Sequence, residues 1–112
     1  MKITKREFEE IVAAKIEMLP DVIKQRLENI EFFVEESSSP NLLGLYHGIP
    51  FPNRKSPSYS LVMPDKIILF KESIEKRCRT MQELEKKIAR VLFHEIGHYM
   101  GLDEEDLKEL NL

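Results

Sequence analysis

The first part of the chain shows two different spacings of hydrophobic residues. From Thr4 to Leu19, apolar residues recur every three or four positions, which is the spacing of a helix with one buried face. Thr4 followed three residues later by Glu7 is the pattern of a capping box, so we expect the helix to begin there. Pro20 interrupts the pattern, and a second helical stretch covers residues 21–27. The proline predicts either two helices or one kinked helix.

The middle of the chain has the composition of short strands joined by loops. In residues 29–36, apolar and other residues alternate with the period of a half-buried strand, and the inward set is Ile30, Phe32 and Val34. Shorter apolar runs predict strands at residues 42–46 and 65–71. Residues 48–60 contain three prolines and three serines, and we interpret them as a surface loop.

The C-terminal part returns to helical spacing. Residues 73–79 predict a short helix. A long amphipathic helix follows, with Thr80 as its N-cap, Glu83 completing a second capping box, and Gly101 just after its end. Residues 103–110 predict one or two further helical turns. With about three predicted strands among these helices, we expect the α+β class.

Length and composition narrow the functional classes. We expect a single domain over residues 1–112, because 112 residues and 13.2 kDa suit one compact unit. The net charge of −3 offers no basic footprint for nucleic acid. Cys78 is alone, so no intrachain disulfide can form and a cytoplasmic location is expected. No apolar run is long enough to cross a membrane, and the N-terminus lacks the apolar core of a signal peptide.

The long C-terminal helix carries the sequence His94-Glu95-Ile96-Gly97-His98, which is an H-E-x-x-H motif. Residues four apart lie on one face of a helix, so both imidazoles can bind one zinc ion. Glu95 lies inside the apolar arc of the helix, where a carboxylate needs a partner or a metal. From there it can act as general base on a zinc-bound water.

A catalytic zinc usually has three protein ligands and an open position. The motif extends to H-E-x-x-H-x-x-G-x-x-E, and Gly101 allows the chain to reverse so that Glu104 can reach the metal. Asp103 lies one residue early and Asp106 two residues late, and both remain alternatives for the third ligand. Neither Tyr46 nor Tyr59 has a spacing that selects it as a donor to an oxyanion.

The motif in residues 94–104 resembles the zinc-binding signature of metzincins, with Glu104 where most metzincins carry histidine. The chain as a whole resembles small bacterial zincin-like metallopeptidases, including in residues 42–48 and 63–70, and the likeness covers about residues 1–110. The resemblance implies a minimal zincin fold, in which a small sheet is flanked by helices and the motif helix packs beneath it. In one respect the sequence departs from metzincins: eight residues follow Glu104 and none is methionine, so we expect no Met-turn in its usual place.

The combined prediction is a zinc-dependent metallopeptidase that hydrolyses short or unfolded peptides. Zinc is held by His94, His98 and Glu104, and Glu95 is the catalytic base and then the acid toward the leaving amine. We expect the strand at residues 65–71 to be an edge strand that pairs with the peptide. The alternatives are a non-catalytic zinc-binding module with a zincin fold and a metal-free relic of one.

Overall fold

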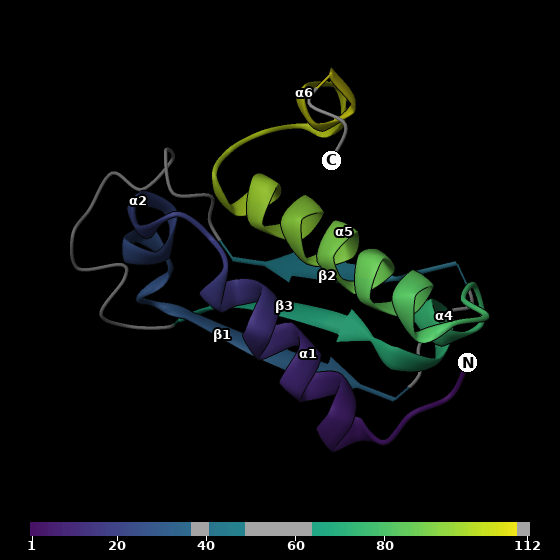
Figure 1. The fold of residues 1–112 in the computed structure, drawn as a ribbon. Coiled ribbons are helices and arrows are strands. Elements are labelled where there is room, and N and C mark those ends of the chain that lie inside the picture. The colour runs from purple at the N-terminus through teal and green to yellow at the C-terminus, as the bar shows by residue number, and fades with distance from the viewer. Residues whose placement is uncertain (37–40, 49–63, 110–112) are drawn as a thin grey trace.

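The computed structural model describes residues 1–36, 41–48 and 64–109 (Figure 1). In chain order its elements are α1 (Lys5–Glu17), α2 (Asp21–Lys24), the 3₁₀ helix η1 (Gln25–Leu27), β1 (Ile30–Glu35), β2 (Gly44–His47), β3 (Asp65–Phe70), α4 (Lys71–Glu75), α5 (Met81–Tyr99) and α6 (Glu104–Glu109). Nearly all of the loop expected at residues 48–60 lies outside the described ranges. A search of the described helices for one that could cross a bilayer found none.

The three strands form one mixed sheet in the order β1-β3-β2. β1 pairs with β3 in parallel, and β2 pairs with β3 antiparallel. The predicted α+β class with a three-stranded sheet is therefore confirmed. The expectation that residues 65–71 form an edge strand is wrong, because β3 lies between the other two strands. Its near-continuous burial is typical of a central strand, whose edges are both used in pairing.

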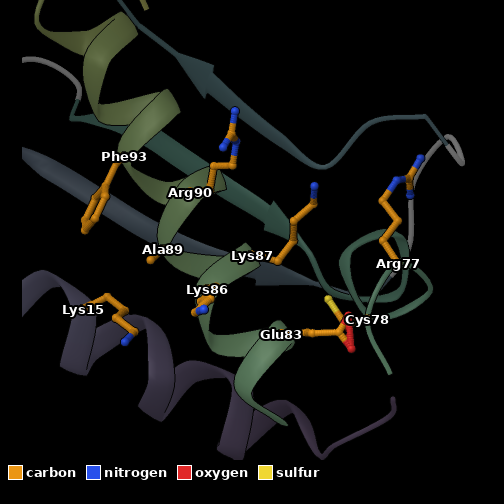
Figure 2. Close-up of a pocket in the computed structure, with 9 residues that line it drawn as sticks. All are labelled: Lys15, Arg77, Cys78, Glu83, Lys86, Lys87, Ala89, Arg90 and Phe93. Atoms are coloured by element: carbon orange, nitrogen blue, oxygen red, sulfur yellow. The ribbon is translucent and has the colours of Figure 1, made fainter. Parts of the chain in front are cut away.

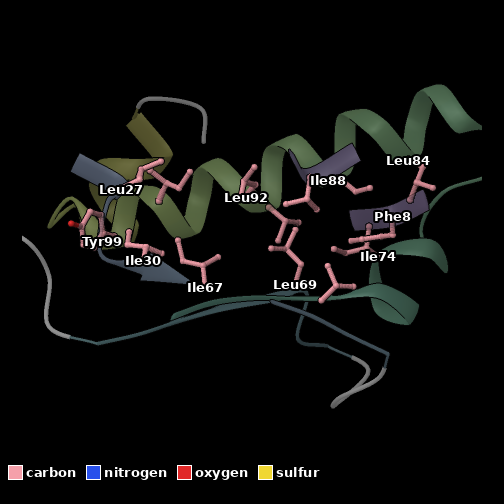
Figure 3. Packing of buried hydrophobic residues seen from close by; sticks show 14 of the residues in the cluster. Phe8, Leu27, Ile30, Ile67, Leu69, Ile74, Leu84, Ile88, Leu92 and Tyr99 are labelled. Carbon is pink, nitrogen blue, oxygen red and sulfur yellow. The ribbon is translucent and has the colours of Figure 1, made fainter. Parts of the chain in front are cut away.

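Helices α1 and α5 lie side by side on one face of the sheet (Figure 1). The core fills the space between these helices and the sheet, and Figure 3 shows side chains from both layers meeting there. β1 contributes its predicted inward set, while Phe33 on the opposite face stays more than a third exposed. The most deeply buried apolar residues are Phe8, Ile67, Leu69, Ile74, Leu84, Ile88, Leu92 and Tyr99.

Capping residues set the helix ends. At α1, the Thr4 hydroxyl accepts from the N–H of Glu7, and the Glu7 carboxylate accepts from the N–H of Thr4, so the predicted capping box is present. At α5, the Thr80 hydroxyl accepts from the N–H of Glu83, but the Glu83 carboxylate accepts from the N–H of Arg79 instead. The second capping box is therefore only half formed, because Glu83 reaches one residue further back.

The structure decides between the two arrangements predicted at Pro20 and moves one other boundary. Pro20 separates α1 from α2, so of the two alternatives the stretches on either side of it are distinct helices. The short helix expected at residues 73–79 begins earlier, at Lys71, directly after β3. This start buries Lys71 and Glu75, four residues apart, as an ion pair with Nζ and Oε2 at 3.0 Å. Sequence spacing alone gives no sign of this buried charge pair, because Lys and Glu are usually exposed.

Candidate metal centre

The polar residues of the H-E-x-x-H motif, His94, Glu95 and His98, all lie in the last turns of α5. His94 and His98 are one helical turn apart, and their ring centroids lie 4.8 Å from each other. Both imidazoles are partly exposed, whereas Glu95 is only 8% exposed. The burial of Glu95 agrees with its predicted place in the apolar arc of the helix.

The chain reverses immediately after α5 in a Schellman motif. Gly101 has a φ of 88°, in the left-handed region that favours glycine, as its position after the helix predicted. The N–H of Gly101 donates to the carbonyl of His98 at 2.9 Å, and the N–H of Leu102 donates to the carbonyl of Gly97 at 3.0 Å. These two bonds satisfy carbonyls at the end of α5 and turn the chain back toward the histidines.

The same turn orients one of the imidazoles. Nδ1 of His98 lies 3.1 Å from the carbonyl oxygen of Leu102, so an N–H at Nδ1 donates to that oxygen. Nε2 of His98 is then the ring nitrogen that faces the candidate site, as in metal centres where a backbone carbonyl fixes the histidine tautomer. Sequence reasoning missed this contact because it uses a backbone atom, although Gly101 indicated the turn that supplies it.

Glu104 brings a carboxylate oxygen to both histidines. Its Oε1 lies 2.9 Å from Nε2 of His98 and 3.2 Å from Nε2 of His94. The hydrogen bond to His94 is the main cause of the lowered pKa of Glu104, and its partnership with His98 adds to the effect. The Glu104 side chain is 75% exposed, so the site is open to solvent on this side.

The two alternative third ligands are engaged elsewhere. The N–H of Asp106 donates to Oδ1 of Asp103 at 2.8 Å, and the N–H of Asp103 donates to Oδ2 of Asp106 at 3.1 Å. This reciprocal pair caps the start of α6. Among the residues that the structure describes, the cluster able to hold a metal consists of His94, His98 and Glu104. Their role as ligands stays a prediction.

The donor set suits a zinc ion. One nitrogen from each imidazole and one carboxylate oxygen lie within 4.8 Å of one another, and tetrahedral zinc with bonds of about 2.0–2.1 Å needs ligand atoms roughly 3.3 Å apart. Both nitrogens converge on an anionic oxygen, so the cluster needs a proton or a cation between its members. Two nitrogens and one oxygen form a common ligand set of catalytic zinc, which leaves a fourth position open.

Glu95 is held against β2 on the other side of the motif. Burial raises the pKa of Glu95, while His98, His94 and the backbone N–H of Tyr46 oppose the increase by favouring the charged form. A Cβ atom built on Gly44 would lie 3.2 Å from Cγ of Glu95 and 2.7 Å from Cγ1 of Val91. A glycine at this position therefore lets β2 pack directly on α5. An isolated glycine in a predicted strand was the only sequence signal of this close approach.

The hydroxyl of Tyr46 has a structural partner. It donates to Oδ2 of Asp65 at 2.6 Å, and the Tyr46 ring packs edge-on against Tyr99 at 5.9 Å. Tyr99 is almost fully buried and donates to the carbonyl of Arg26, as expected of a core residue. These contacts argue against Tyr46 as a donor to an oxyanion, and the other tyrosine considered, Tyr59, lies outside the described residues.

A hollow of about 310 Å³ opens beside the motif. One wall comes from residues 41–44, at the start of β2, and the opposite wall comes from α5. His94, Glu95 and Glu104 all line it, so the proposed base and two of the candidate ligands face the same space. This arrangement leaves room for a small segment of another molecule next to the cluster.

Comparison with known proteins agrees with this geometry. In structure, the chain is similar to a conserved hypothetical protein from T. thermophilus, with 23% identity, a TM-score of 0.62, and coverage of 88% of this chain and 94% of that chain. This likeness shows the fold alone. No curated protein matched the chain. The family model described as zincin-like metallopeptidase matches residues 15–112. The chain therefore belongs to the zincin-like metallopeptidase family.

Proposed function

We propose that this chain is a cytoplasmic zinc-dependent peptidase that acts, as one domain over residues 1–112, on short or unfolded peptides. The observation that carries the proposal is the convergence of three ligand atoms within 4.8 Å next to the buried carboxylate of Glu95. Family membership supports the same chemistry. The hollow of about 310 Å³ has room for a small segment of a substrate, which favours short or unfolded peptides over folded proteins.

His94, His98 and Glu104 would hold the zinc ion. When bound, zinc polarises the carbonyl of a peptide and makes water a stronger acid. The Leu102 carbonyl keeps Nε2 of His98 turned toward the ion, and the chain reversal at Gly101 keeps Glu104 within reach. The protein's contribution is thus to fix three donors on one helix and the turn after it.

Glu95 would transfer the protons of the reaction. Its carboxylate takes a proton from water as the water attacks the peptide carbonyl, and it gives that proton to the leaving amine. Burial raises the pKa of Glu95, which makes its carboxylate a stronger base than one in water. The hydrogen bond from the N–H of Tyr46 holds the carboxylate in place at the edge of β2.

The peptide would bind along β2, which replaces residues 65–71 as the proposed pairing strand. The N–H of Phe70 donates to the carbonyl of Leu43 at 2.9 Å, so Leu43 and Phe70 are a hydrogen-bonded pair. In an antiparallel ladder the next residue, Gly44, then directs its backbone groups away from β3 and toward the outer edge. An extended peptide added there would run over the hollow beside Glu95.

A peptide-library cleavage assay on zinc-loaded protein tests this function. We expect Glu95→Gln to retain one zinc per chain and to lower turnover at least about a hundredfold, because it removes the acid–base group. Glu85→Gln, on the same helix but outside the hollow, is the matched control and should turn over normally. Unchanged turnover in Glu95→Gln would refute the role of Glu95.

Zinc binding is tested separately from turnover. We expect Glu104→Gln to weaken zinc binding by at least roughly 10–100-fold. Loss of a residue that only hydrogen-bonds to a metal ligand already has an effect of that size. The neighbouring acid gives a matched control, Glu105→Gln, which should bind zinc normally. Stoichiometric zinc without cleavage of any peptide would instead favour the non-catalytic zinc-binding module. Protein that never takes up zinc would favour the metal-free relic.

A further inference from the structure

A basic hollow on the outer side of α5 adjoins the candidate metal centre. It has a volume of about 550 Å³, and five of its nine lining residues are Lys or Arg, whereas one is Glu (Figure 2). Two of the basic residues, Lys87 and Arg90, also line the hollow that contains Glu95. Lys87 and Arg90 therefore border both the basic hollow and the hollow beside the candidate metal centre.

Lys87 and Arg90 are placed to meet a bound molecule. They are three residues apart on α5, and their side chains leave the helix on the same side in Figure 2. Within the described part of the chain, neither side chain forms an ion pair with an acid. The chain carries a net charge of −3, so this local excess of positive charge runs against its overall balance.

Helix geometry relates these charges to the proposed scissile bond. Arg90 precedes His94 by four residues and Lys87 precedes it by seven, which corresponds to about 6 Å and about 10 Å along the helix axis. An extended peptide advances about 3.4 Å per residue. The two cations therefore lie alongside peptide positions about two and three residues from the bond that lies next to the histidines.

We propose that the substrates are acidic peptides, with Asp or Glu about two or three residues from the scissile bond, bound by Lys87 and Arg90. This inference rests on the proposed peptidase function and adds a substrate class to it. A peptide is favoured over a nucleic acid because Glu95 and Glu104 line the same hollow. Their carboxylates would repel a continuous phosphate backbone, whereas a peptide can carry its negative charge on one side of the site only.

Binding to the zinc-loaded Glu95→Gln variant tests the inference without requiring turnover. The probes are fluorescein-labelled peptides of matched length, which carry two Glu residues on one or the other side of the centre, or Gln at all of those positions. We expect an acidic peptide to bind several-fold more tightly than the Gln peptide in fluorescence anisotropy. Raising NaCl from 50 to 500 mM should remove this preference.

Added substitutions locate the contact. Lys87→Gln and Arg90→Gln should each weaken binding of the acidic peptide about two- to fivefold, as expected of partly exposed ion pairs. Neither should change binding of the Gln peptide. Lys86→Gln makes the same charge change on the same helix, but Lys86 lines only the basic hollow and not the hollow next to Glu95, so it should weaken binding less than Lys87→Gln or Arg90→Gln.

Three results would overturn the inference. They are equal binding of acidic and Gln peptides, a loss in Lys86→Gln as large as in Arg90→Gln, and stronger displacement of the acidic peptide by single-stranded DNA than by unlabelled peptide. Cleavage of the Gln peptide by the zinc-loaded wild type, together with any of these results, would leave the peptidase function standing. Salt-sensitive binding of acidic peptides without cleavage of any peptide would refute the peptidase function but not the binding of acidic peptides.

Discussion

Replacing Gly44 with alanine tests how closely β2 packs on α5. The new Cβ would lie 2.7 Å from Cγ1 of Val91, about 1 Å inside the usual carbon–carbon contact of roughly 3.5–4.0 Å. Overpacking of this kind costs about 1–3 kcal/mol. Replacing glycine also lowers the conformational entropy of the unfolded chain, which stabilises the folded protein by about 0.4–1 kcal/mol. The middle of each range gives an expected net loss of about 1.3 kcal/mol.

Urea and thermal unfolding of the EDTA-treated protein measure this loss. A change of about 1 kcal/mol moves the Tm of a domain of this size by roughly 4 °C. Val91→Ala removes the methyl group that the new Cβ would meet, and alone it costs roughly 1.5–2 kcal/mol in lost burial. Because it relieves the clash, Gly44→Ala combined with Val91→Ala should be at least about 0.5 kcal/mol more stable than the sum of the single effects predicts.

Turnover of the zinc-loaded variants separates packing from the site. Cγ of Glu95 is the other neighbour of the new Cβ, at 3.2 Å, and Val91→Ala does not remove it. Turnover should therefore stay reduced in the double variant even though the clash with Val91 is relieved. A Gly44→Ala protein with wild-type stability, or strictly additive effects with Val91→Ala, would refute the close approach of β2 to α5.

Three further predictions concern residues away from the metal centre. Lys71→Met should lower the free energy of unfolding in urea by about 3–5 kcal/mol, because the Glu75 carboxylate, which is only 5% exposed, loses its cation. A loss below about 1 kcal/mol would contradict this. Cys78 should react with a thiol reagent such as DTNB far more slowly in the folded protein than in urea, because burial raises its pKa; equal rates would refute its burial. Hydrogen bonds from the backbone and side chain of Thr4 lower the pKa of Glu7, so its contribution to stability is present above the unfolded pKa and lost as pH falls through the folded pKa. The gap in Tm between wild type and Glu7→Gln should therefore narrow as the pH falls from 7 into the acid range, and a gap that does not change with pH would count against the capping box.

Local features were predictable from the sequence because their causes are local. The spacing of His94 and His98 puts two imidazoles on one helix face whatever surrounds the helix. Gly101 marks the helix end because glycine adopts the left-handed conformation without a steric penalty. The capping box of Thr4 and Glu7 depends on residues only three apart. These features together indicated the motif helix and the chain reversal that follows it.

The choice among Asp103, Glu104 and Asp106 needed the tertiary structure. All three acids lie within reach of the metal site by length of chain. Asp103 and Asp106 bond to each other's backbone at the start of α6, which leaves Glu104 as the acid that meets His94 and His98. Sequence distance could not separate them, because the direction of each side chain depends on the path of the turn.

The strand order also needed the tertiary structure. An apolar run such as residues 65–70 is consistent with either a central or an edge strand, because periodicity does not report which neighbours a strand has. Pairing with β1 on one side and β2 on the other placed β3 in the centre and left β2 beside Glu95. The sequence by itself thus determined the motif helix and its turn, through contacts between residues close in the chain. The tertiary structure alone decided which strand lines the site, since that choice depends on long-range pairing.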